Sequence, residues 1–349
     1  MKRLIILLSL IILTAYTVRP VQAAEYTAPP VPSGAEEYMP PHTESFGEGL
    51  WKILKFAVSK MYPAFADAAS VCFSVISVIL LISLLQTIPG NGTSITALAG
   101  CVSIGLLFLK PAHTLIGLGA ETITTLYDYG KLLLPVMTSA LAAQGGITSS
   151  AVLYTGTALF CSLLTGFVLH FIVPMLYIFL CLSVACSAIR DDMLNKIRDF
   201  VKWLMIWSLK TILYIFTGYL TITGVVSGTA DASAIKAAKL TISGMVPVVG
   251  GILSDASETI LISAGIMKNS AGVYGLLAMT AVWIGPFLRI ACQYLLTKLT
   301  SAVCSVIGSR EASGLVEDFA GAMGIVLAMT GAVCLFLMIS TVCFMKGVS

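Results

Sequence analysis

Charged side chains are scarce in this sequence and are missing altogether from long parts of it. Only 11% of the residues are Asp, Glu, Lys or Arg, compared with roughly a quarter in ordinary globular domains. Between Lys131 and Arg190, 58 consecutive residues carry no charge, and residues 68–109, 269–288 and 319–345 form similar runs. A soluble helix needs a polar face, whereas an ionised side chain in the middle of a bilayer costs several kcal/mol. The sequence therefore predicts a polytopic membrane protein.

The same scarcity excludes several functions. The net charge of +3 is small and scattered, so we expect no nucleic-acid partner. The nine cysteines lie in or beside apolar segments without C-x-x-C spacing, and the three histidines are isolated, so we expect no metal site and no cofactor. No P-loop, G-x-S-x-G or H-E-x-x-H motif occurs, so we do not expect an enzyme.

The apolar segments predict an all-α protein with about six transmembrane helices, within a range of five to eight. A span needs about 20 apolar residues. The expected spans are residues 68–88, 94–109, 151–189, 203–226, 272–307 and 320–345. Residues 151–189 are too long for one ordinary crossing. They form either two tight spans that meet near residues 170–174 or one steep span that continues beyond the bilayer.

Residues 111–144 have the pattern of an amphipathic helix. Glu121, Thr125 and Asp128 fall on one face. The other face is apolar and comprises Ile116, Gly119, Ile123, Leu126, Gly130 and Leu133. We expect this helix to dock on the membrane or re-enter it, and to be interrupted at Pro135.

The N-terminal residues have the features of an exported segment. In residues 1–23, two basic residues precede the apolar residues 4–15, and Val21-Gln22-Ala23 resembles a cleavage site, which predicts a signal peptide. The alternative is an uncleaved first span. Residues 24–45 are Pro-rich and are expected to form an extended linker with little capacity to build a core. The mature N-terminus would then lie outside the cytoplasm.

Residues 46–349 are expected to form the membrane domain, beginning with a basic amphipathic helix over residues 46–61. Lys52 and Lys55 fall on its polar face, which is typical of a helix that lies on the membrane surface, with docking in a partner's groove as the alternative. Residues 190–202 contain four basic and three acidic residues in 13 positions. This mixture predicts a water-facing helix on the cytoplasmic side.

Two basic residues stand inside apolar spans. Arg289 must face protein or water, so it either lines a pore or substrate path or pairs with an acid such as Glu121 or Glu258. Lys210 either belongs to the same kind of site or extends its side chain toward the charged residues 190–202.

The string around Gly250 and Gly251 predicts a broken helix. The glycine pair follows Pro247, and Asp255 can cap a new helix with Glu258 three residues later. Inside an apolar environment such a helix start is a candidate pore-lining or partner-docking site. A surface-lying helix cap is the alternative.

The last apolar segment has a small residue at every fourth position. These residues are Ala320, Gly324, Ala328 and Ala332. Such a ridge allows another helix to approach closely. It predicts helix packing either within the chain or between subunits.

Residues 247–261, PVVGGILSDASETIL, are followed by Lys-Asn-Ser-Ala-Gly and the apolar residues 272–304. Together they resemble the stage III sporulation protein AE family of endospore-forming bacteria. The resemblance implies a mother-cell membrane component, active during engulfment, of a channel apparatus that links mother cell and forespore. It also implies support of late forespore gene expression. The implied partners are membrane lipid, other stage III sporulation proteins including a secretion-type ATPase, and a forespore membrane protein.

No catalytic residues are carried over from this resemblance. An alternative function remains open, namely a self-sufficient secondary transporter or permease for a small solute. Its site would comprise Lys210, Arg289 and the break at Gly250 and Gly251.

The order of basic residues, apolar core and small residues predicts cleavage after Ala23. We expect the mature chain to begin near Ala24. N-terminal sequencing of the membrane-bound protein checks this, and recovery of intact Met1 would contradict it.

Overall fold

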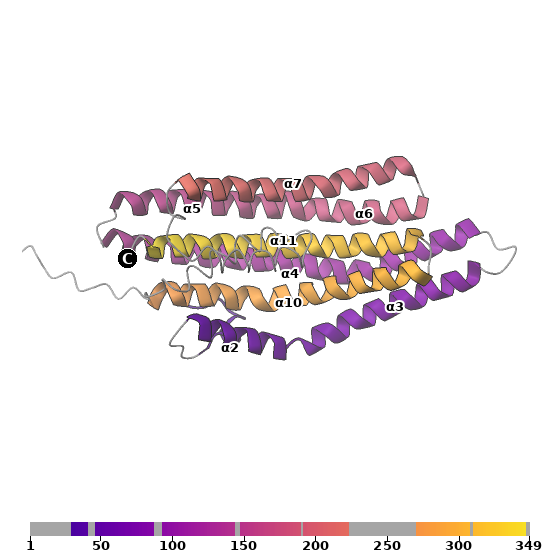
Figure 1. Cartoon of the computed structure of the whole chain (residues 1–349), viewed down its shortest axis with the longest axis horizontal. Helices are drawn as coiled ribbons and strands as arrows, with labels where there is room; N and C mark the ends of the chain where they lie inside the picture. The colour runs from indigo at the N-terminus through magenta and orange to yellow at the C-terminus, as the bar shows by residue number, and fades with distance from the viewer. Residues whose placement is uncertain are drawn as a thin grey trace, which may run out of the picture.

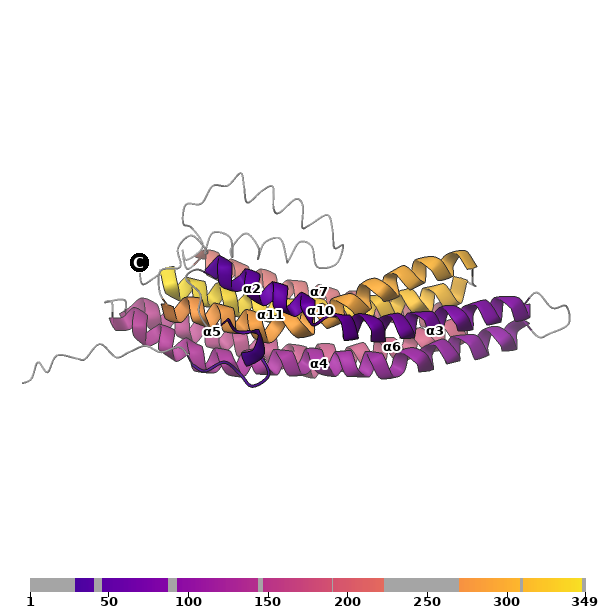
Figure 2. The same ribbon diagram turned by 90° about the horizontal axis from the view of Figure 1, so that it is seen from below.

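The structure is a computed structural model and describes residues 29–40, 46–86, 93–143, 147–189, 191–222, 270–307 and 310–346. Within these ranges every regular element is helical. The long helices run side by side along one axis and form an elongated bundle (Figure 1 and Figure 2). The expected signal peptide and the element around Gly250 lie outside the described residues.

The bundle is built from eight long helices in the described ranges. They are α2 (Phe46–Ser59), α3 (Tyr62–Gln86), α4 (Thr93–Ala143), α5 (Ile147–Phe167), α6 (Val173–Ile189), α7 (Asp192–Ile222), α10 (Ser270–Ile307) and α11 (Arg310–Lys346). A short 3₁₀ helix, η1 (Glu36–Tyr38), precedes them, and a π-helical turn, η2 (Val168–Ile172), joins α5 to α6. Six helical segments of this part of the chain are long and apolar enough to cross a membrane. The prediction of an all-α polytopic protein with about six spans is confirmed.

Helix α11 lies at the centre of the bundle. In its most apolar stretch 94% of the residues are buried, compared with 22% for α3 and for α7. It packs against α4, α5, α6, α7 and α10 (Figure 1). Because other helices cover it on every side, its charge-free sequence reflects burial in protein more than contact with lipid.

Small residues bring the neighbours of α11 close to it. The predicted ridge residues Ala320, Ala328 and Ala332 are at most 4% exposed. A Cβ atom on Gly324 would lie 3.3 Å from the ring of Tyr294 on α10. Where α4 packs on α11, Cβ atoms on Gly119 and Gly130 of α4 would lie only 2.7 and 2.8 Å from the α11 residues Val326 and Leu337. A larger residue at any of these three positions would require the neighbouring side chain to shift, so glycine favours the close approach of the helices.

Helix α4 is longer than the sequence suggests. It joins the expected span at residues 94–109 to the amphipathic residues 111–144 in one helix of 51 residues, about 77 Å long at 1.5 Å per residue. Pro111 and Pro135 both lie inside it and do not end it. Proline removes one backbone hydrogen bond but adopts helical φ, and packing against α11 and α10 holds the helix together. The expected interruption at Pro135 is therefore wrong, whereas the predicted apolar face is buried.

Residues 147–189 also form one uninterrupted helical run. Its π-helical turn at Val168–Ile172 ends two residues before Pro174. Proline cannot donate to the carbonyl group four residues earlier, and a wider turn accommodates this defect. The structure thus has one long helical segment here, and the alternative of two tight spans meeting near residues 170–174 is not observed.

Helix α2 occupies the position predicted for the basic amphipathic helix. Its Ile53 and Ala57 are buried and it packs against α10, whereas Trp51, Lys52 and Lys55 are exposed. The amphipathic pattern is therefore used to dock this helix on the bundle. Its position at a membrane surface stays a prediction.

We predict that Gly324→Leu destabilises the bundle by about 1–3 kcal/mol, because the larger side chain would overlap the Tyr294 ring. Gly314→Leu is the matched control on the same helix, since a Cβ atom there meets nothing within 4 Å. Thermal unfolding in detergent and protein level in cells measure both. Equal losses in the two variants would contradict the close packing at Gly324.

Candidate functional site

The predicted site residues that the structure describes do not gather at one place. Gly250, Gly251, Asp255 and Glu258 lie outside the described residues. Arg289 is an exposed residue of α10, and the four small residues of α11 are part of the packed centre.

Arg289 lines a hollow between the N-terminal segment, α4 and α10, which we name the Arg289 hollow. Its volume is about 240 Å³. It is lined by Ser33, Gly34, Ala35 and Tyr38, by Leu118, Glu121, Thr122 and Thr125 of α4, and by Ala281, Val282, Gly285, Pro286 and Arg289 of α10. Sequence separates its two charged residues, Glu121 and Arg289, by more than 160 positions. The fold brings them to one cavity.

Glu121 and Arg289 share the hollow without forming an ion pair. Both are exposed, and within the described ranges neither side chain has an ionic partner. The hydroxyl groups of Thr122 and Thr125 donate to the carbonyl oxygens of Leu118 and Glu121, at 2.7 and 3.0 Å. The two charges are thus left available to water or to a polar ligand.

The N-terminal segment forms one wall of the hollow. The Tyr38 ring packs edge-on against Phe56 of α2, with ring centroids 5.3 Å apart. Gly285 makes room for Tyr38, because a Cβ atom there would lie 3.0 Å from the Tyr38 hydroxyl oxygen.

Further contacts hold this wall against the bundle. Glu37 accepts a hydrogen bond of 2.7 Å from Lys60, which raises the pKa of Lys60. Val31 and Ala35 are buried. Residues 29–40 therefore dock on the bundle, although the sequence predicts a linker with little capacity to build a core.

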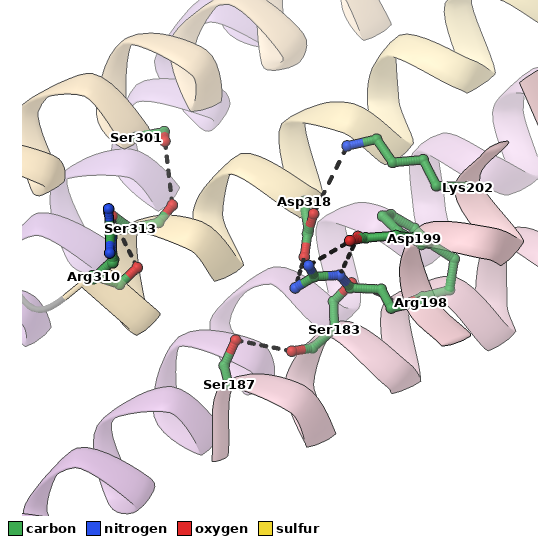
Figure 3. Close-up of polar contacts among 10 residues, drawn as sticks. Ser183, Ser187, Arg198, Asp199, Lys202, Ser301, Arg310, Ser313 and Asp318 are labelled. Atoms are coloured by element: carbon green, nitrogen blue, oxygen red, sulfur yellow. Dashed lines mark hydrogen bonds and ion pairs between the residues drawn. The ribbon is translucent and has the colours of Figure 1, made fainter. Parts of the chain in front are cut away.

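A second polar cluster joins α7 to α11 (Figure 3). The Asp318 side chain is only 9% exposed, and its Oδ2 atom lies 3.1 Å from Nη1 of Arg198. Lys202 adds a longer contact of 3.8 Å. Arg198 also donates to Asp199 from Nε and Nη2, at 3.1 and 2.9 Å. Ser183 of α6 lies beside the Asp318 carboxylate.

This cluster limits the prediction of a water-facing helix over residues 190–202 to part of its side chains. Asp192, Lys196 and Asp199 are exposed, but Arg198 and Lys202 turn toward Asp318. Sequence analysis missed Asp318. The available signal was its position directly before the charge-free residues 319–345.

Lys210 belongs to neither polar group. It lies partly exposed on α7, and it is absent from the lining of the Arg289 hollow. Lys210 and Arg289 are therefore not brought together at this hollow.

We predict that Asp318→Asn costs about 1.5–3 kcal/mol of stability, because Arg198 loses its buried counter-charge and keeps only the exposed Asp199. Glu317→Gln is the matched control at the next position. It removes a carboxylate that is 43% exposed and pairs with Lys298, so about 1 kcal/mol or less is expected. Thermal unfolding of the purified variants measures the difference, and similar melting temperatures would show that the buried pair does not stabilise the bundle.

Comparison with known proteins agrees with the resemblance of the central string. The stage III sporulation protein AE family matches residues 42–347. Stage III sporulation protein AE of Bacillus subtilis (strain 168) is 24% identical over 204 residues, which are 58% of this chain and 51% of that protein. The match thus spans about half the length of that relative. No solved structure matches. The family match covers most of this chain, and the chain therefore belongs to the stage III sporulation protein AE family.

Proposed function

We propose that this sporulation membrane protein is a non-enzymatic subunit of a channel or secretion-like complex that connects mother cell and forespore. It would lie in the mother-cell membrane around the forespore, with the mature N-terminus outside the cytoplasm. The complex would support late forespore gene expression. The partners would be other stage III sporulation membrane proteins, a forespore membrane protein and a secretion-type ATPase.

The observation that carries this proposal is the Arg289 hollow on the flank of the bundle. Glu121 and Arg289 are exposed there without ionic partners in the described part of the chain. Within a membrane such charges must face water or polar protein groups. The bundle therefore offers a polar surface at its side, where a neighbouring subunit or a water-filled path can lie.

The lack of an energy-coupling motif in the sequence supports a role as one subunit of a larger assembly. The sequence contains no nucleotide-binding motif that would couple transport to ATP. Any energy for directed movement would come from a gradient or from an associated ATPase. A subunit with a rigid helical centre and one polar flank suits such an assembly.

The same hollow favours one second candidate, a self-sufficient transporter. A cavity of about 240 Å³ with one acidic and one basic side chain could hold a small polar solute. This candidate requires that the purified protein alone moves a solute across a bilayer.

We predict that Arg289→Gln lowers the yield of heat-resistant spores while protein level stays near wild type. The side chain has no ion pair in the described residues whose loss would destabilise the bundle. Lys298→Gln is the control on the same helix, because it removes an exposed charge that pairs with Glu317. Spore counts and immunoblots measure both variants. Normal sporulation of Arg289→Gln would show that the charge of Arg289 in the hollow is not needed for the function.

Affinity isolation separates the two candidates. From cross-linked sporulating cells we expect the tagged protein to bring down other sporulation membrane proteins, and proteoliposomes with the protein alone should show no solute flux. Flux that is lost in both Arg289→Gln and Glu121→Gln would instead establish the transporter.

A further inference from the structure

Helix α4 carries a continuous polar face beside the Arg289 hollow. We name it the α4 polar face. It consists of the exposed residues Lys110, His113, Thr114, Gly117, Glu121, Thr124, Asp128 and Lys131. Apart from the adjacent His113 and Thr114 they follow one another at three or four positions, and so lie along one side of the helix. Ile116, Ile123 and Leu126 on the opposite side are completely buried.

The length of this face matches the thickness of a membrane. Lys110 and Lys131 are 21 positions apart, which is about 32 Å along a helix and close to the roughly 30 Å of a hydrocarbon core. Residues 95–139 also form one of the six candidate spans. The polar positions thus extend over a distance comparable to a complete crossing.

Other helices are apolar on their exposed sides at the same level of the bundle. The hydrogen bond between His113 and Tyr177, 3.0 Å long, sets α4 against α6. Counting from this contact along the two helical runs, which are antiparallel, Leu159 and Leu163 of α5 lie at about the level of α4 residues 127–131. These leucines are 53% and 59% exposed.

Helix α7 shows the same apolar surface. Its Phe216 contacts Phe160 of α5, with ring centroids 5.7 Å apart. The neighbouring Tyr214 and Ile215 are 68% and 55% exposed. At this level of the bundle, α5 and α7 therefore present surfaces suited to lipid, while α4 presents a polar one.

The charges on the α4 polar face are poorly compensated. Asp128 pairs with Lys131 at 3.2 Å, with both side chains more than half exposed. Glu121 and Lys110 have no ionic partner within the described residues. Contact with acyl chains would cost several kcal/mol for each such group. Water is the contact that satisfies all of them together.

We infer that the α4 polar face lines a water-filled path through the membrane. Glu121 belongs to both this face and the Arg289 hollow, so the hollow opens onto the path. The inference rests on the proposed function, because the remaining walls come from other subunits. The wall carries charges of both signs, so it suits hydrated solutes without selecting strongly for one sign.

Reactivity of single cysteines tests this path. Cys181 is the exposed member of the nine free cysteines and the others are buried, so Cys181→Ser supplies a quiet background. Thr124→Cys and Asp128→Cys probe the α4 polar face, and Leu159→Cys and Leu163→Cys are the matched controls at about the same level on α5. The probe is a charged methanethiosulfonate reagent, applied to sporulating cells and to inverted membrane vesicles.

We expect the two cysteines on α4 to react about tenfold or more faster than those on α5, because only the hydrated thiolate is reactive. Labelling in denaturing detergent confirms that each cysteine is present. Equal reactivity at all four positions would place this level outside the bilayer and overturn the inference. Unreactive α4 positions would also overturn it, including positions that react only after purification, since another protein then covers the face.

These failures leave the proposed function standing if affinity isolation still recovers the partner proteins. If no partner proteins are recovered but the α4 cysteines are labelled fast, the role as a subunit of a complex is rejected, whereas the contact of the α4 polar face with water is supported. The two proposals can therefore fail separately.

Discussion

The arrangement depends on one constraint, which is that an ionised side chain must find water or a counter-charge. Helix α11 satisfies it by carrying no charge over residues 319–345 and by lying inside five other helices. Its first turns do carry charges, and there Asp318 meets Arg198 across the boundary with α7. The glycines at positions 119, 130 and 324 allow neighbouring helices to approach α11 closely enough to cover it. The outer helices are then positioned by a centre that has little freedom to shift.

The two polar groups of the bundle differ in a way that separates structure from function. At Asp318 the charges are buried and compensated by Arg198 and Lys202, so the cluster fixes α7 against α11. At the Arg289 hollow the charges are exposed and unpaired within the described residues. A compensated buried pair holds elements in register and is costly to break. Exposed charges without ionic partners on a cavity wall contribute little to stability. Contact with water or a partner protein explains them better.

Sequence periodicity predicts the features that depend on one helix at a time. Together with the apolar runs, which give the all-α class and the approximate number of spans, it identifies the apolar face of α4, because burial repeats with the helical period. It fails where distant segments meet. Pro135 signals a break locally, but packing keeps α4 continuous. The partnership of Arg198 with Asp318 and the shared cavity of Glu121 and Arg289 join positions more than 100 residues apart, and no local pattern specifies them.

The hydroxyl groups of α4 indicate what its polar face can do. Thr114 and Thr124 donate to the carbonyl oxygens of Lys110 and Ala120, both at 3.0 Å. These hydroxyl groups donate within the helix, so the face offers mainly acceptor oxygens and the charged ends of flexible side chains to its surroundings. A tight binding site needs several fixed donors and acceptors that converge on a ligand. A hydrated face with few fixed free donors is better suited to the passage of solutes than to binding them. The close packing of α4 on α11 holds this face in a fixed position.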